Sequence, residues 1–144
     1  MTITKELLED MAGYYTRKGM HCELPGENML KVWFEDPRLE NLKKVPIVIV
    51  VDAANLSCKL FCFSLYQVPE EKEVAAAVLM NTINNAEFVF PRYSVDDDNE
   101  VKASLCMIIL PDNMPNSLLL PGVVARMAKD IDSVYPVIKN NLES

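Results

Sequence analysis

The order of its periodic segments limits this chain to a small set of folds. Apolar residues first recur with helical spacing; three strand-like runs, a helix, two more strands and a last helix follow. The link Ala53 to Asn55 between the second and third strands is too short for a parallel return, which needs about a dozen residues. The sequence therefore predicts an α+β fold, a two-layer α/β sandwich with a five-stranded antiparallel sheet and the order α-β-β-β-α-β-β-α.

Three helices are expected from their apolar stripes and end signals. The first follows a cap at Thr4 and ends before Gly19, which suits the left-handed position just past a helix. The second opens at Pro69 beside two acids and ends at Asn84-Asn85, with Val74 and Val78 on its apolar side.

The last helix is expected to cover roughly Ser117 to Leu142. Pro121 suits a first turn. Pro136 lacks a backbone N–H, so it is expected to kink this helix or to end it early.

The strand runs are bounded by turn residues. Leu24 to Asn28 is interpreted as a turn around Pro25-Gly26, and Asp96 to Asn99 as a hairpin turn. The strands are expected at Met29–Glu35, Val45–Asp52, Leu56–Gln67, Glu87–Val95 and Glu100–Leu110.

The central strands are more apolar than a sheet with one solvated face requires. Such a sheet should alternate apolar and polar residues, yet Ile47 to Val51 is continuously apolar. Two arrangements satisfy this pattern. The helices split across both faces, or they cover one face and the other meets a second subunit or a client protein. A bare face would exceed the few hundred Å² that soluble monomers usually expose.

Length, charge and cysteine usage narrow the class of protein. The 144 residues suit a single domain over 1–144, and the net charge of -7 disfavours nucleic acid as a partner. The first residues lack the features of a signal peptide, and no run approaches the ~18 apolar residues that span a membrane. Cys58 and Cys62 would lie about 13 Å apart on one strand, which is too far for a disulfide bond between them. We therefore expect a cytoplasmic protein with reduced cysteines and no membrane partner.

No catalytic or metal-binding motif stands out. The 4 glycines are too scattered for a phosphate-binding loop. His21 and Cys22 are adjacent, so on an extended chain their side chains point to opposite faces. The acidic run at Asp96 lacks the glycine and glutamate that a calcium loop would need, which favours a turn. We expect no catalytic residue, no metal and no cofactor.

Aromatic residues offer the best candidates for a contact surface. Trp33 fits an interface anchor and core burial equally well. The candidate apolar contact residues are Trp33, Phe61, Phe63 and Tyr66. In the alternative interpretation, the same four line an apolar pocket between sheet and helices that takes a small ligand.

The stretch Ile83 to Val101, with a helix ending on Asn, an aromatic strand and an acidic hairpin, resembles the YbjN-type family. Ser133 to Ile138, with its Tyr-Pro pair, resembles that family's closing helix. The element order is similar to that of class I type III secretion chaperones. The resemblance implies an α/β sandwich that homodimerises and has no enzymatic activity. The expected function is a non-enzymatic cytoplasmic protein-interaction module, chaperone-like or regulatory, acting as a dimer on an unknown client, with a small-ligand sensor as the alternative.

Overall fold

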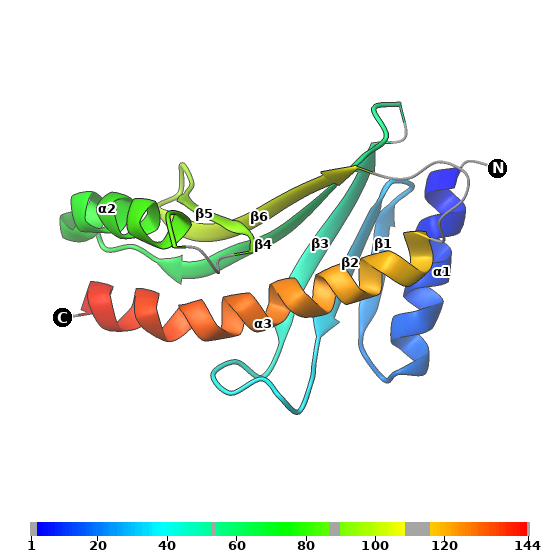
Figure 1. Cartoon of the computed structure of the whole chain (residues 1–144), viewed down its shortest axis with the longest axis horizontal. Helices are drawn as coiled ribbons and strands as arrows, with labels where there is room; N and C mark the ends of the chain where they lie inside the picture. The colour runs from blue at the N-terminus through cyan, green and yellow to red at the C-terminus, as the bar shows by residue number, and fades with distance from the viewer. Residues whose placement is uncertain (1–2, 53, 87–89, 109–115, 144) are drawn as a thin grey trace.

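The computed structural model describes residues 3–52, 54–86, 90–108 and 116–143 (Figure 1). All strands pair antiparallel in one six-stranded sheet of order β1-β2-β3-β4-β6-β5. In chain order the elements are α1 (Ile3–Arg17), β1 (Cys22–Gly26), β2 (Met29–Phe34), β3 (Val45–Asp52), β4 (Ser57–Gln67), the 3-10 helix η1 (Glu70–Lys72), α2 (Glu73–Asn84), β5 (Arg92–Val95), β6 (Glu100–Ile108) and α3 (Asn116–Glu143).

The α+β class and the antiparallel sheet are confirmed, but the prediction of five strands is wrong. The missing strand is β1, so four strands rather than three lie between the first two helices. Four of its five residues are exposed, it contains Pro25, and its register shifts between Glu23 and Gly26. An exposed edge strand with a bulge carries no apolar alternation, which is why the sequence indicated only a turn there.

The hairpin of β5 and β6 differs from its prediction at the outer ends. Phe90 and Pro91 are not in a strand, and β5 begins at Arg92. The rest of the predicted strand start, 87–89, and the predicted end of β6, 109–110, lie outside the described residues.

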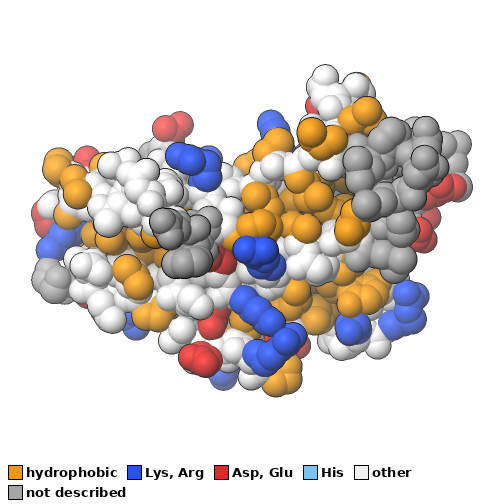
Figure 2. Space-filling view, in the orientation of Figure 1, with side chains coloured by type: hydrophobic (Ala, Val, Ile, Leu, Met, Phe, Trp, Pro, Cys, Tyr) orange, Lys and Arg blue, Asp and Glu red, His pale blue; other side chains and the backbone are white. Residues whose placement is uncertain are grey.

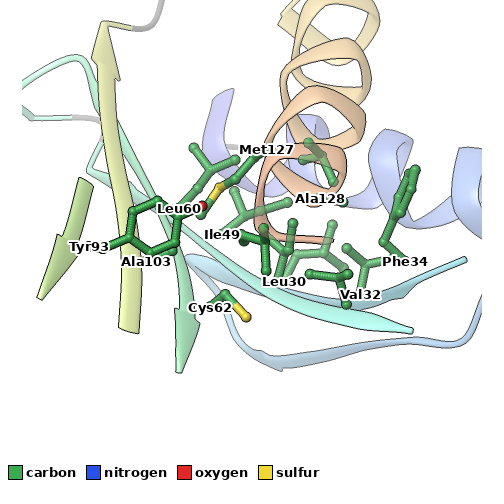
Figure 3. Close-up of a cluster of buried hydrophobic side chains, with 14 of the residues drawn as sticks. Leu30, Val32, Phe34, Ile49, Leu60, Cys62, Tyr93, Ala103, Met127 and Ala128 are labelled. Carbon is green, nitrogen blue, oxygen red and sulfur yellow. The ribbon is translucent and has the colours of Figure 1, made fainter. Parts of the chain in front are cut away.

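The described helices cover one face of the sheet. Burial alternates along β3, where Ile47 and Ile49 are buried and Val48 and Val50 are only partly buried. In Figure 1, α3 crosses the sheet, with α1 near β1 and α2 near β5. Figure 3 shows Met127 of α3 facing this buried side of the strands. The described helices therefore do not split across both faces, as the first of the two predicted arrangements required.

Helix α3 runs unbroken through Pro121 and Pro136 to Glu143, so the expected early end is wrong. A proline has no N–H to donate to the carbonyl four residues earlier. That carbonyl belongs to Asp132, and it accepts a hydrogen bond from Asn41 Nδ2 at 2.9 Å. A side chain from the loop between β2 and β3 therefore replaces the bond that Pro136 removes.

The side chain of Asp132 holds the same loop. Asp132 is buried, and its carboxylate accepts the backbone N–H groups of Glu40, Asn41 and Leu42 at 2.8, 2.9 and 2.7 Å. We call this arrangement the loop clasp. It joins residues about ninety positions apart and fixes the loop that connects β2 and β3 to α3.

A second polar contact closes the β5 edge of the sheet. Asn84, the last residue of α2, donates from Nδ2 to the Tyr93 carbonyl at 2.7 Å and accepts the Tyr93 N–H on Oδ1 at 2.8 Å. The buried Tyr93 hydroxyl donates to Asp130 Oδ2 on α3 at 2.6 Å. These bonds, which we call the edge clamp, tie α2, β5 and α3 together.

Candidate functional site

The side of the sheet opposite the helices carries apolar side chains that no described helix covers. Along β3 these are Val48 and Val50, and Val48 pairs directly with Phe61 of β4. We call this side the open face. At its β6 end Cys106 is exposed, and Ile108 is 74% exposed. The apolar excess of the central strands therefore lies on solvent-facing sheet surface.

Three of the four predicted contact residues lie on the open face. The rings of Phe61 and Phe63 stack with centroids 5.1 Å apart, and Phe63 is 45% exposed. The Trp33 ring contacts the His21 ring, with centroids 4.6 Å apart, and Lys31 Nζ lies 4.6 Å from its centroid. Half-exposed aromatic rings of this kind are typical anchors of protein interfaces.

Tyr66 lies on the other face of the sheet. Cys62 pairs with Ala103 and Tyr66 with Val101, so β4 holds two more residues than β6 over this span. Ser64, with φ 55°, forms this bulge, and beyond it Tyr66 packs against the helix-covered core. Because Trp33, Phe61 and Phe63 lie on the open face, these three do not line a pocket between sheet and helices.

A groove of about 440 Å³ opens on this face between β4 and β6. Its lining residues are Lys59, Phe61, Arg92, Ser104, Leu105 and Cys106. The volume falls within the range of typical ligand pockets, and the walls combine apolar surface with two cationic side chains. The groove can therefore take an apolar group that carries a negative charge.

Two cysteines lie on the helix-covered face of the sheet, opposite the open face. Cys58 and Cys62 are buried free thiols, and burial raises the pKa of each to about 12. At neutral pH both stay protonated, and a thiol in that state is a poor nucleophile. They serve as small apolar side chains of the core.

The adjacent His21 and Cys22 do not meet. His21 Nε2 lies 3.3 Å from Glu23 Oε1, whereas Cys22 Sγ lies 3.4 Å from Thr16 Oγ1 on α1. Among the residues that the structure describes, no group of three or more His, Cys, Asp and Glu side chains could hold a metal ion.

The acidic run forms the predicted hairpin turn. Asn99 has φ 58°, and Asp96 Oδ1 accepts the N–H groups of Asp98 and Glu100 at 2.9 and 3.0 Å. Asp96 thus binds its own turn, as Asp often does where the chain reverses. Gly19, with φ 82°, likewise takes the left-handed position predicted for it after α1.

The outer side of α2 is a second exposed apolar surface. Val74 and Val78, predicted on the apolar side of this helix, are 79% and 62% exposed, while Ala76, Met80 and Ile83 are buried. Beyond Glu73 the helix carries no charged residue. Apolar side chains are visible at the α2 end of the molecule, on the left of Figure 2.

Solved structures show which known proteins share this architecture. The chain matches a chain of the ExsC–ExsE complex with a TM-score of 0.56 and 11% identity, covering 96% of this chain and 97% of that one. It matches YbjN of E. coli with a TM-score of 0.53 and 14% identity, covering 89% and 87%. The fold is YbjN-like. The predicted resemblance is thereby confirmed at the level of the fold.

The YbjN-like fold also occurs in a secretion system. A chain of the heterodimeric ExoU–SpcU complex, from the type III secretion system of Pseudomonas aeruginosa, matches with a TM-score of 0.52 and 12% identity, covering 94% of this chain and 97% of that one. Searches with family models and against curated proteins found no match. No described helix is both long enough and apolar enough to cross a membrane.

Proposed function

We propose that this protein is a non-enzymatic interaction module that works in the cytoplasm as a homodimer and binds a protein client on the open face. The observation that carries the proposal is an apolar sheet face with partly exposed aromatic side chains and no described helical cover. Soluble monomers rarely leave a large apolar patch bare, and such patches mark interaction sites.

Two further observations support this function. The matched structures include the ExsC–ExsE complex and the ExoU–SpcU heterodimer, so this fold occurs in proteins that pair with a different protein. All four cysteines are free, which suits a reducing compartment such as the cytoplasm.

The outer side of α2 is the proposed self-association surface. Val74 and Val78 lie one helical turn apart, and the absence of charge beyond Glu73 means that two copies could pack there without opposing like charges. The open face suits self-association less, because pairing it with itself would bring two sets of the same lysines and arginine together.

Client binding can be tested with a photo-reactive amino acid at Phe63. Because this ring is half exposed on the open face, irradiation in native cytosol is expected to produce discrete adducts with one or a few proteins. The matched control places the same group at Lys139, which is exposed on α3. The proposal fails if both positions give the same adducts, or if Phe63 gives none.

Self-association can be tested by replacing both Val74 and Val78 with aspartate. The wild-type protein is expected to sediment at micromolar concentration with twice the chain mass of 16.3 kDa. Buried carboxylates at the interface should weaken the dimer at least about a hundredfold, since desolvating an unpaired charge costs several kcal/mol.

The control for this test is Val137→Asp, a valine on α3 that is 44% exposed. It adds an acidic group at an exposed valine away from α2 and should leave the dimer intact. A monomeric wild-type protein, or a Val74→Asp/Val78→Asp variant that remains dimeric, would contradict the assignment of α2.

A further inference from the structure

The open face is richer in cations than the acidic chain as a whole. The protein has a net charge of -7, yet this face carries four cations. Three carboxylates lie on the same side by strand register, and they are Glu23, Asp52 and Glu100. Lys59 and Lys31 project beside the valines of β3, because they pair with Val50 and Val48. Lys102 and Arg92 extend the set across β6 and β5.

None of these four cations forms a salt bridge within the described residues. Three carboxylates on or beside the face have other polar partners, and of these Glu23 Oε1 lies 3.3 Å from His21 Nε2. Glu35 Oε1 pairs with Lys44 Nζ at 3.2 Å, and Asp52 Oδ2 accepts Asn55 Nδ2 at 2.7 Å. The cations therefore remain available to an external anion.

Two of the cations flank the apolar groove. Lys59 and Arg92 line it together with Phe61 and Leu105, and Arg92 pairs across the strands with Ser104. An apolar side chain that entered the groove would place a neighbouring carboxylate within reach of a cation. An arginine can bind such a carboxylate through two parallel hydrogen bonds.

We propose that the occupant of the open face is an acidic amphipathic segment of a partner protein, with apolar side chains in the groove beside Phe61 and carboxylates on Lys59 and Arg92. This inference rests on the proposed client-binding function and adds the chemistry of the client. A second copy of the chain fits this face less well, because it would bring a second set of the same cations onto it. An anionic membrane fits less well, because the remainder of the chain is strongly acidic.

The test uses two fluorescein-labelled peptides of equal length, one alternating leucine with glutamate and one alternating leucine with lysine. Net charge alone predicts that the basic peptide binds this acidic protein more tightly. The proposal predicts the reverse, with about tenfold tighter binding of the acidic peptide at low salt and weaker binding as salt rises. Fluorescence anisotropy at about 50 mM and about 300 mM salt measures both.

Charge reversal locates the binding site. Lys59→Glu combined with Arg92→Glu is expected to weaken acidic-peptide binding by about tenfold or more. The control combines Lys43→Glu with Lys139→Glu, two exposed cations in the β2–β3 loop and on α3, and changes the net charge by the same amount. It should bind within about twofold of wild type. Circular dichroism checks that both variants are folded.

Several results would overturn the inference. They are tighter binding of the basic peptide, no measurable binding of the acidic one, and equal losses in the two variants. Binding to vesicles with phosphatidylserine that only Lys59→Glu/Arg92→Glu abolishes would assign the face to a membrane instead. The adducts at Phe63 are scored separately, so a client can be found on this face even when its selectivity for acidic segments fails.

Discussion

Replacing Asp132 with alanine is expected to lower the free energy of unfolding by about 3 kcal/mol, the largest effect among the substitutions considered. The loop clasp gives three backbone N–H groups one buried carboxylate as acceptor. Without that carboxylate the N–H groups either stay buried and unpaired or pull the loop away from α3. Urea unfolding followed by circular dichroism measures the loss.

Two matched variants make this expectation specific. Asp132→Asn keeps an oxygen for the N–H groups of Asn41 and Leu42, which share Oδ1, and loses only the bond to Glu40. It should lose about half as much stability as Asp132→Ala. Ser133→Ala, at an exposed neighbour on α3, should change stability by less than about 0.5 kcal/mol. A loss below about 1 kcal/mol in Asp132→Ala would show that the clasp does not hold the loop.

Replacing Asn84 with alanine is expected to cost about 2 kcal/mol, because both hydrogen bonds of the edge clamp to Tyr93 are lost. Asn81→Ala, an exposed asparagine on the same helix, is the control and should be near neutral. The same urea titration compares them. Equal stability of the two variants would contradict the role of the clamp.

Asn84→Asp adds a pH signature to this test. Its carboxylate can accept the Tyr93 N–H but cannot donate to the Tyr93 carbonyl, so the pKa of the new group should rise in the folded state. A raised folded-state pKa contributes stability that is present at low pH and is lost as pH rises. The deficit of this variant relative to wild type should therefore shrink as pH falls through the raised folded-state pKa, and it should level off near about pH 4, the ordinary pKa of Asp in the unfolded chain.

Local rules predicted the parts of the fold that depend on one or two residues. Gly19 after α1 and Asn99 in the acidic hairpin have the positive φ values expected from their residue types and positions. Pro136 does not end its helix, and Asn41, far away in sequence, hydrogen-bonds the carbonyl that the proline leaves free. Strand β1 was missed because its pairing with β2 rests on backbone hydrogen bonds and not on buried side chains.

The candidate site was predictable only in part, because some of its features depend on strand pairing between residues far apart in sequence. Continuous apolar runs indicated a second apolar face and drew attention to Phe61 and Phe63, which lie on it. Tyr66 lies on the opposite face because side chains alternate along β4, and the two extra residues at the Ser64 bulge leave that alternation unchanged. The approach of Arg92 to Lys59 depends on the register of three strands, which one sequence does not reveal.

The edge clamp also bears on the size of assembly that this chain can form. At β5 the side chain of Asn84 occupies the outward N–H and carbonyl of Tyr93, and at β1 Pro25 and a register shift disturb the ladder. An incoming strand finds poor hydrogen-bonding partners at both places. Growth into filaments by strand-to-strand addition is therefore disfavoured, and self-association is left to the helix and sheet faces.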